Sequence, residues 1–293
     1  MDYSDLHRLL NRELLDLYPE REIGSIGRLV TEHVTGMSAV QLQVNQHRSY
    51  TSAEESQILS VIKRLKAHEP IQYILGETEF YGLRLKVRPG VLIPRGETEE
   101  LVEWILTVLT DKEKGKRKKE KGWRILDIGC GSGAIAIALA KKLPDAEIIA
   151  ADISEESLAL ARENAELNQV SIAILYFNIL IQEPSLAGSM SPFDVIVSNP
   201  PYIPTRERPG MERHVVDFEP ATALFVPDED PLVFYRAIAS FAQSNLVTGG
   251  ELFVEIHDRL GRETETLFRN YFDQVEMRKD IHGKDRMIRA CHG

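Results

Sequence analysis

The fold is decided by the stretch "RILDIGCGSGAIAIALA", residues 124–140, in which closely spaced glycines join one apolar run to another. The first run is short and almost continuously apolar, as expected for a buried strand, and the second has the length and composition of a helix. Between them, Gly129, Gly131 and Gly133 allow a tight turn and let a ligand approach the backbone without interference from a Cβ. The stretch therefore predicts a strand, a ligand-binding loop and a helix, in that order.

The same alternation continues after this stretch. Strands are expected at residues 146–151, 171–177, 193–198 and 250–256, and helices at 97–110, 154–168 and 231–246. Strands that alternate with helices and read as continuous apolar runs form a parallel sheet covered on both faces. The tail, residues 273–293, is expected to add two antiparallel edge strands around a His282-Gly283 turn. The predicted fold class is α/β, with a mostly parallel Rossmann-like sheet and an antiparallel edge.

The region before this sheet has a different character. Residues 1–75 show apolar side chains at helical spacing and predict a small α-helical domain. One helix is expected to begin in a capping box, with Ser52 as the N-cap and Glu55 reaching back to it. Residues 76–94 contain short apolar runs broken by glycines and predict a β-hairpin linker. The third expected part is the sheet domain, residues 95–293.

The composition narrows the class of protein. The chain has 293 residues, of which 43% are hydrophobic and 27% charged, as in an ordinary soluble protein, and its net charge of -10 counts against a surface devoted to nucleic acid. Two cysteines make no disulfide framework or zinc motif. With no signal-like or spanning apolar run, we expect a cytoplasmic protein without a membrane partner. The lysine-rich run, residues 111–124, is interpreted as a solvated loop or frayed helix end, with an RNA-contacting patch as the alternative.

The glycine loop indicates a class of ligand. It lies at the carboxyl end of a strand, where open α/β sheets bind their ligands. Asp152 ends the following strand, where an acidic side chain accepts hydrogen bonds from ribose hydroxyls. The GxGxG spacing with Asp127 before it is typical of S-adenosylmethionine (AdoMet) sites, because no phosphate must be cradled and the carboxylate can face an ammonium group. A dinucleotide site and a structural turn are the alternatives. Cys130 is interpreted as a small side chain that fits the loop, since no activating base is evident.

A second motif, Asn199-Pro200-Pro201-Tyr202, follows the expected strand 193–198 at the same edge of the sheet. The prolines fix φ and lack N–H donors, which holds the Pro200 carbonyl in place as an acceptor. The Asn199 side-chain oxygen and this carbonyl can accept both N–H groups of a planar NH2, and Tyr202 offers a flat face to it. Such a clamp predicts catalysis by orientation and electrostatics, without a metal. A rigid surface turn is the alternative.

Both motifs resemble those of amino-group methyltransferases that act on adenine, guanine or glutamine. The segments "PIQYILGETEFYGLRLKVRPGVLIPRGETEELVE" (residues 70–103) and "FEPATALF" (residues 218–225) resemble the release factor glutamine methyltransferases, the PrmC/HemK family. The resemblance covers nearly the whole chain. It implies methyl transfer from AdoMet, giving S-adenosyl-L-homocysteine, to the glutamine side-chain amide in the Gly-Gly-Gln motif of peptide chain release factors during translation termination. It also implies that the helical domain docks this protein substrate.

The resemblance assigns roles to individual residues. Asn199 and Pro200 are implied to be catalytic, and they bind the substrate together with Pro201 and Tyr202. The implied AdoMet-binding residues are Gly129, Cys130, Gly131, Ser132, Gly133, Asp152, Asn178, Ile179 and Asn199. Residues implied to lie near the cofactor are Arg95, Glu97 and Thr98. Two positions depart from the family pattern: Gly96 replaces a proline, and Asn178 replaces an aspartate near the adenine amine. An amide oxygen can still accept that hydrogen bond.

Two other functions remain open at this stage. A nucleic-acid adenine or guanine methyltransferase would use the same clamp, but it needs a surface that contacts phosphates. The acidic net charge and the absence of a separate basic domain count against direct nucleic acid binding. An inactive AdoMet-binding module is the other alternative. The intact Asn199-Pro200-Pro201-Tyr202 motif argues against it, whereas Asn178 keeps it open.

Overall fold

The computed structural model describes residues 1–45, 48–114, 122–181 and 192–292. It divides into two compact units, Met1–Glu77 with Glu212–Phe218, and Thr78–Met211 with Glu219–Gly293. The domain bounds expected from the sequence, 1–75, 76–94 and 95–293, stay a prediction. Residues 115–121 of the lysine-rich run lie outside the described residues, so its interpretation also stays a prediction.

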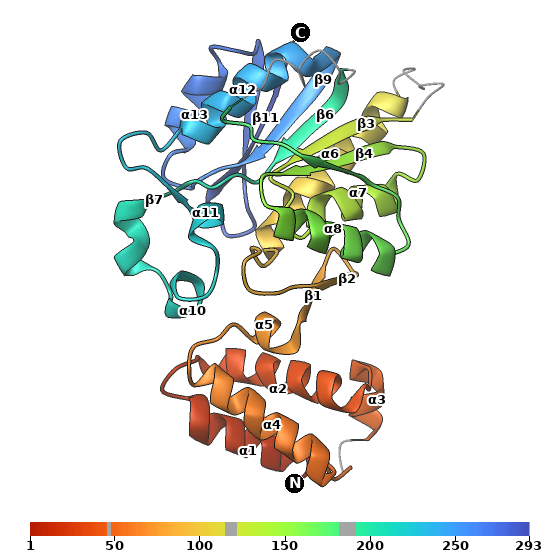
Figure 1. The fold of residues 1–293 in the computed structure, drawn as a ribbon, viewed down its shortest axis with the longest axis vertical. Coiled ribbons are helices and arrows are strands. Elements are labelled where there is room, and N and C mark those ends of the chain that lie inside the picture. Colours follow the sequence, from red (N-terminus) through yellow and green to blue (C-terminus); the bar gives the residue numbers. More distant parts are fainter. Residues whose placement is uncertain (46–47, 115–121, 182–191, 293) are drawn as a thin grey trace. The chain divides into compact units, whose positions relative to one another are not determined.

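The first unit is helical (Figure 1). Its helices are α1 (Tyr3–Leu14), α2 (Glu20–Thr35), α3 (Ala39–Val44), α4 (Ser52–Leu65), α5 (Ile71–Leu75) and α10 (Arg213–Val216). The apolar stripes of α1, α2 and α4 meet in one core, in which Leu6, Leu10 and Ile58 are fully buried. The predicted amphipathic helices therefore form a small bundle that buries its own apolar faces.

The predicted cap of α4 is wrong by one residue. Thr51, not Ser52, is the N-cap: its hydroxyl accepts from Glu54 N–H at 3.3 Å, and its own N–H donates to the Glu54 carboxylate at 2.7 Å. The sequence Thr-Ser-Ala-Glu-Glu contains two overlapping capping boxes, so the pattern alone does not choose between them. Glu55 has another role, because it accepts from the N-terminal ammonium of Met1 at 2.6 Å.

The predicted hairpin is present as β1 (Glu77–Phe80) and β2 (Leu83–Lys86). Tyr81 and Gly82 between them have φ of 52° and 72°, as a two-residue type I′ turn requires. Asn164 ties β2 to the glycine loop. Its amide nitrogen donates to the carbonyls of Lys86 and Ser132, both at 3.0 Å, and its oxygen accepts from Lys86 N–H at 2.7 Å.

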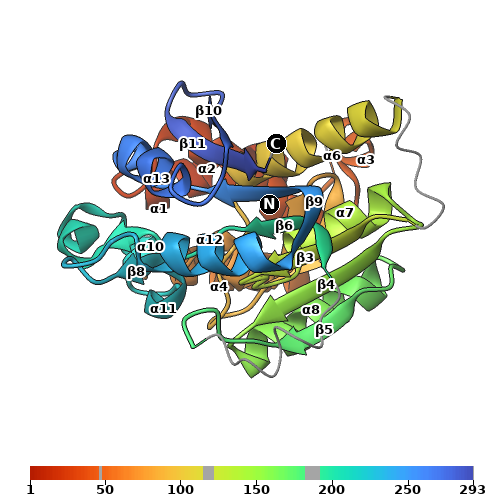
Figure 2. The same ribbon diagram turned by 90° about the horizontal axis from the view of Figure 1, so that it is seen from above.

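The second unit contains the predicted sheet, which has the strand order β10-β11-β9-β6-β3-β4-β5 (Figure 2). The strands are β3 (Arg124–Ile128), β4 (Glu147–Asp152), β5 (Ala173–Tyr176), β6 (Phe193–Ser198), β9 (Leu246–Glu255), β10 (Gln274–Lys279) and β11 (Asp285–Cys291). Strands β3, β4, β5, β6 and β9 are parallel, whereas β11 runs antiparallel to both β9 and β10. The fold class and its antiparallel edge are therefore confirmed.

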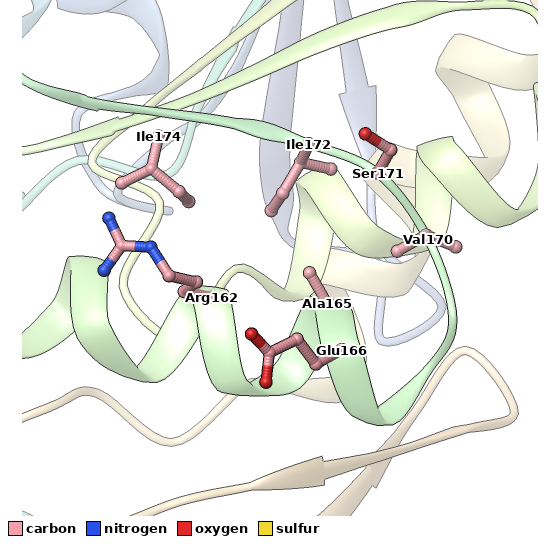
Figure 3. A pocket seen from close by; sticks show the side chains of 7 residues that line it. All are labelled: Arg162, Ala165, Glu166, Val170, Ser171, Ile172 and Ile174. Carbon is pink, nitrogen blue, oxygen red and sulfur yellow. The ribbon is translucent and has the colours of Figure 1, made fainter.

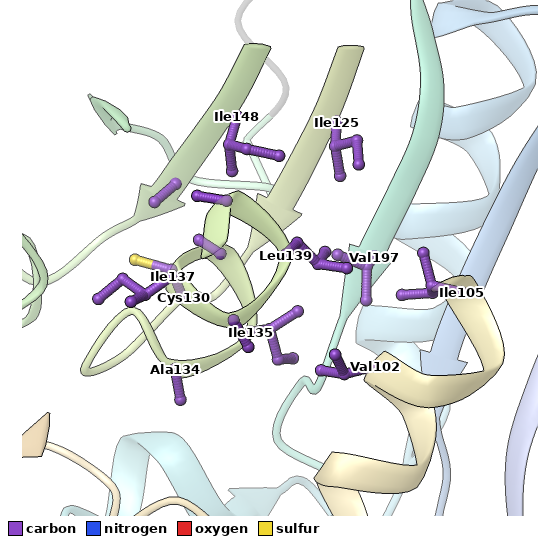
Figure 4. Packing of buried hydrophobic residues seen from close by; sticks show 14 of the residues in the cluster. Val102, Ile105, Ile125, Cys130, Ala134, Ile135, Ile137, Leu139, Ile148 and Val197 are labelled. Carbon is purple, nitrogen blue, oxygen red and sulfur yellow. The ribbon is translucent and has the colours of Figure 1, made fainter. Parts of the chain in front are cut away.

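Helices cover both faces of this sheet. They are α6 (Gly96–Lys114), α7 (Ala134–Lys142), α8 (Glu155–Leu167), α12 (Val233–Asn245) and α13 (Gly261–Phe268). The first three pack on one face, where Ile135 and Leu139 of α7 contribute to the cluster that holds Ile125 and Val197 (Figure 4). Side chains of α12 and α13 pack on the other face, against alternate strand residues such as Leu126. Burial on both sides explains why the strands read as continuous apolar runs.

Short elements follow the Asn199-Pro200-Pro201-Tyr202 motif. They are β7 (Ile203–Pro204), the 3₁₀ helix η1 (Thr205–Gly210), α11 (Ala221–Leu224) and β8 (Phe225–Val226), with β7 and β8 paired in parallel. These elements were not predicted from the sequence, and neither was α13, whose sequence, Gly261–Phe268, is mostly polar. Of the helices in the described ranges, none combines the length and the apolar character that crossing a membrane requires.

Candidate functional site

The glycine loop connects β3 to α7 and is held to β4 by backbone hydrogen bonds. Gly129 N–H and Cys130 N–H both donate to the Ala151 carbonyl, at 2.8 and 3.0 Å. Gly129, Gly131 and Gly133 have φ of 74°, 54° and 82°, a region that other residues rarely adopt. A Cβ on Gly133 would also lie 3.0 Å from the Cβ of Ala161. The glycines are therefore required by backbone conformation and, at Gly133, by the packing of α7 on α8.

Asp152, at the carboxyl end of β4, supports the same loop. One carboxylate oxygen accepts from Gly131 N–H at 2.9 Å, and the other accepts from Ser154 N–H at 2.9 Å. Burial raises the pKa of this carboxyl above its ordinary value, while the backbone donors lower it. Each carboxylate oxygen has a second lone pair, so Asp152 can hold the loop and still accept from a ligand hydroxyl.

Asp127 is fully buried beneath the loop. Its Oδ2 accepts from Ala136 N–H in the first turn of α7 at 3.1 Å, whereas Oδ1 has no hydrogen-bond partner among the described residues. Burial, together with the neighbouring Asp152, raises the pKa of Asp127 to about 7, although the hydrogen bond from Ala136 N–H lowers it. An unpaired buried carboxylate oxygen is costly, and a cationic group placed against it relieves that cost.

The remaining loop residues have local roles. Burial holds the pKa of the Cys130 thiol well above its usual range, and the nearby Asp127 and Asp152 raise it further, which disfavours a nucleophilic thiolate. Ser132 is buried, and its carbonyl accepts from Asn164. After β5, Asn178 Oδ1 accepts from Leu180 N–H at 3.0 Å, and Ile179 is buried.

The proline motif continues directly from β6. Asn199 Nδ2 donates to Thr98 Oγ1 at 3.2 Å, and no hydrogen bond to Asn199 Oδ1 is found in the described ranges. Pro200 is buried, Pro201 is half-buried, and the Pro200 carbonyl accepts no backbone hydrogen bond from the described residues. Neither of the two acceptors predicted from the sequence is therefore engaged by these groups.

Tyr202 is more constrained than the sequence indicated. Its hydroxyl donates to Glu255 Oε1 at 3.0 Å, and its half-buried ring meets His257 edge-on, with 6.0 Å between ring centroids. Burial, followed by the adjacent Glu255 carboxylate, raises the pKa of the phenol. The ring is thus fixed at its hydroxyl end, and its use as a stacking face remains a prediction.

Sequence reasoning missed two buried carboxylates. Glu255 ends β9 and accepts from Thr98 Oγ1 at 2.7 Å as well as from Tyr202. Glu219 accepts from Ile93 N–H at 3.1 Å and pairs with Arg95, which joins the segments 70–103 and 218–225. The available signal for Glu255 was an acidic residue at the carboxyl end of an apolar strand, the same signal that identified Asp152. Arg95 lies in a structural ion pair, and Thr98 contacts both Asn199 and Glu255.

A surface pocket lies elsewhere, between α8 and β5 (Figure 3). It encloses about 330 Å³ and is lined by Arg162, Ala165, Glu166, Val170, Ser171, Ile172 and Ile174. None of the predicted site residues lines it, so the candidate site remains at the carboxyl edge of the sheet. Within the described ranges, no group of three or more His, Cys, Asp or Glu side chains is placed to hold a metal ion.

Comparisons with known proteins agree along the chain. Residues 8–76 match the family described as the PrmC N-terminal domain, and residues 106–215 match the methyltransferase small domain. A release factor glutamine methyltransferase from Flavobacterium psychrophilum is 44% identical over 94% of this chain and 94% of its own. One from Bacteroides thetaiotaomicron is 40% identical over 96% of this chain and 97% of its own. A solved SAM-dependent methyltransferase from Agrobacterium tumefaciens shares the fold, with a TM-score of 0.50 and 12% identity, covering 74% of this chain and 70% of its own.

Proposed function

Since this chain belongs to the release factor glutamine methyltransferase family, we propose that it methylates the glutamine of the Gly-Gly-Gln motif in peptide chain release factors. Asn199 carries this proposal. Its NH2 group is engaged by Thr98, which leaves Oδ1 and the neighbouring Pro200 carbonyl as acceptors at the edge of the sheet. Two acceptors match the two N–H groups of a primary amide.

The residues of the glycine loop fit AdoMet as the methyl donor. The unpaired, buried Oδ1 of Asp127 suits the ammonium group of AdoMet, and the free lone pairs of Asp152 suit its ribose hydroxyls. Gly129–Gly133 let the ligand approach the backbone, and Asn178 and Ile179 would line the adenine end. AdoMet supplies an electrophilic methyl group on a sulfonium sulfur.

The chain's own contribution to the reaction is orientation. An amide nitrogen is a poor nucleophile because its lone pair is delocalised into the carbonyl. Asn199 Oδ1 and the Pro200 carbonyl would accept its two N–H groups and direct the lone pair at the methyl carbon. The nitrogen gains a methyl group and loses one proton to water, which leaves a secondary amide and S-adenosyl-L-homocysteine. Tyr202 would close the pocket around the planar amide.

The helical unit is proposed as the docking surface for the release factor. It contributes none of the candidate site residues, and residues 8–76 match the PrmC N-terminal domain. Because release factors act during translation, the proposed location is the cytoplasm. We propose no membrane partner and no direct binding of nucleic acid.

One assay tests the function. The purified chain and AdoMet are incubated with a release factor, with the same factor carrying Gln→Ala in the Gly-Gly-Gln motif, and with RNA and DNA. Mass spectrometry then locates any added methyl group. We expect one methyl on the motif glutamine and none on the variant factor. Methylation of nucleic acid would instead indicate an adenine or guanine methyltransferase. AdoMet binding without transfer to any substrate would indicate an inactive AdoMet-binding module.

A further inference from the structure

Glu255 places a buried carboxylate directly behind the Asn199-Pro200-Pro201-Tyr202 motif. Only 1% of the residue is exposed, and no salt bridge to it is found among residues 1–45, 48–114, 122–181 and 192–292. Its two oxygens accept from two hydroxyls, Thr98 at 2.7 Å and Tyr202 at 3.0 Å. Burial raises the pKa of the Glu255 carboxyl, whereas the hydrogen bonds from Thr98 and Tyr202 and the charge of nearby Arg286 lower it and so favour the ionised form. Burying a carboxylate with two hydroxyl donors and no ion pair is costly, so its position calls for a compensating role.

The direction of these hydrogen bonds follows from the donors available. A carboxylate only accepts, and each hydroxyl carries a single proton. Thr98 gives its proton to Glu255, so toward Asn199 it can only accept. Asn199 must therefore turn its NH2 group toward Thr98 and its Oδ1 away from it. The charge on Glu255 thereby selects one of the two orientations of the Asn199 amide.

We propose that Glu255 is a positioning residue, which through Thr98 keeps Asn199 Oδ1 facing the substrate nitrogen and through its second oxygen anchors Tyr202. The inference rests on the proposed function, because the orientation matters only if Asn199 accepts a substrate N–H. Without the carboxylate, the Thr98 proton is free to donate to Asn199 Oδ1. The Asn199 amide then flips, so that its NH2 group faces the NH2 group of the substrate amide. Two donors that face each other repel.

Four substitutions separate this role from a structural one. Glu255→Gln keeps the shape but adds a donor, and Thr98→Val removes the connecting hydroxyl while keeping the volume. Thr98→Ser restores the hydroxyl. Tyr235→Phe is the matched control, because the Tyr235 hydroxyl lies in the same cluster but donates to the Glu255 main-chain carbonyl at 3.3 Å and accepts from His257 N–H.

The measurements are kcat and KM for release factor methylation, the Kd for S-adenosyl-L-homocysteine, and the thermal midpoint. We expect Glu255→Gln and Thr98→Val each to lower kcat by about 100-fold, as a misplaced catalytic group does, with Kd unchanged. Thr98→Ser and Tyr235→Phe should stay close to the parent kcat. Because the two residues act in one chain of hydrogen bonds, the double variant should lose little more than either single variant.

A second readout needs no substrate. The side-chain NH2 resonance of Asn199, assigned by its loss in Asn199→Ala, should shift in Glu255→Gln and Thr98→Val but not in Tyr235→Phe. If the parent methylates no release factor, the proposed function fails, and this resonance still decides whether Glu255 orients Asn199. An unshifted resonance, or equal activity of Thr98→Val and Thr98→Ser, would overturn the inference. If Glu255→Gln does not fold, the Thr98 pair gives the same decision.

Discussion

The two halves of the candidate site lie at the same edge of the sheet but are built from different parts of the chain. The loop between β3 and α7 is held by backbone groups: Gly129 and Cys130 donate to Ala151, and Gly131 donates to Asp152. The turn after β6 is held by a chain of side-chain hydrogen bonds that runs from Asn199 to Thr98, then to Glu255 and Tyr202. A backbone cradle depends on conformation, whereas a chain of side chains depends on the identity of each member. Substitutions in the glycine-loop half should therefore act through packing and charge, and substitutions in the half after β6 should act through the orientation of Asn199.

Asn199→Ala gives the largest expected effect, because it removes an acceptor that faces the reacting nitrogen. Loss of one such group costs about 100- to 1000-fold in kcat. The Kd for S-adenosyl-L-homocysteine should change much less than kcat, since Asn199 is one of nine implied cofactor-binding residues and the other eight lie outside the turn after β6. Steady-state kinetics and calorimetry check both statements. If the variant loses ligand affinity as strongly as turnover, the two halves of the site are not independent.

The charge of Asp127 gives the next effect. Its pKa is about 7 in the folded protein against an ordinary value of 3.8, so below pH 7 the carboxyl is mostly neutral and cannot pair with an ammonium group. We expect the Kd for S-adenosyl-L-homocysteine to tighten about tenfold per pH unit as pH rises toward 7 and then to level off. Asp127→Asn should bind weakly and without this slope. A parent affinity that is constant between pH 5.5 and 7 would contradict the assigned role.

The raised pKa of Asp127 also predicts how the stability of the folded protein changes with pH. A carboxyl whose folded pKa is raised destabilises the folded state once it ionises, so the ligand-free protein loses stability as pH rises from about 4 to 7. Bound ligand supplies the missing cation and should restore part of it. The rise in thermal midpoint on adding S-adenosyl-L-homocysteine should therefore be larger at pH 7.5 than at pH 6, and Asp127→Asn should remove that difference.

The glycine loop gives a smaller effect, on folding. Gly133→Ala places a Cβ 3.0 Å from Ala161 Cβ at a φ of 82°, whereas a Cβ on Gly129 meets nothing within 4 Å at a φ of 74°. Both variants pay the cost of the left-handed conformation, about 1–2 kcal/mol, and Gly133→Ala adds the packing clash between α7 and α8. Chemical denaturation should rank Gly133→Ala as less stable than Gly129→Ala. Equal stabilities would show that α7 can move away from α8.

The sequence was sufficient where one physical requirement dominated. The strands were predicted because burial on both faces makes them continuously apolar, and the loop because Gly129, Gly131 and Gly133 occupy positive φ. It was insufficient where spatial neighbours decide. The capping box was misplaced because Glu55 is taken by the Met1 ammonium, 54 positions away in the chain. Glu255 ends an apolar strand as Asp152 does, but its role could not be predicted because its partners come from α6 and from the turn after β6, which no local pattern brings together.

The smallest expected effect concerns Gly96, where a proline stands in the family pattern. Gly96 is the first residue of α6, and a Cβ built on it meets nothing within 4 Å. Proline is favoured at the first position of a helix, because no intrahelical hydrogen bond is lost there and its φ is preset. Gly96→Pro should therefore stabilise the protein by about 0.4–1 kcal/mol by restricting the unfolded chain. Gly96→Ala is the matched control, and it should recover only part of the gain. Thr98, two residues later, holds Asn199. Because proline at the first helical position is compatible with the helix, Thr98 should stay in place and kcat should be unchanged. A fall in kcat at unchanged stability would instead mean that the glycine sets the position of Thr98, and that the side-chain half of the site extends to the start of α6.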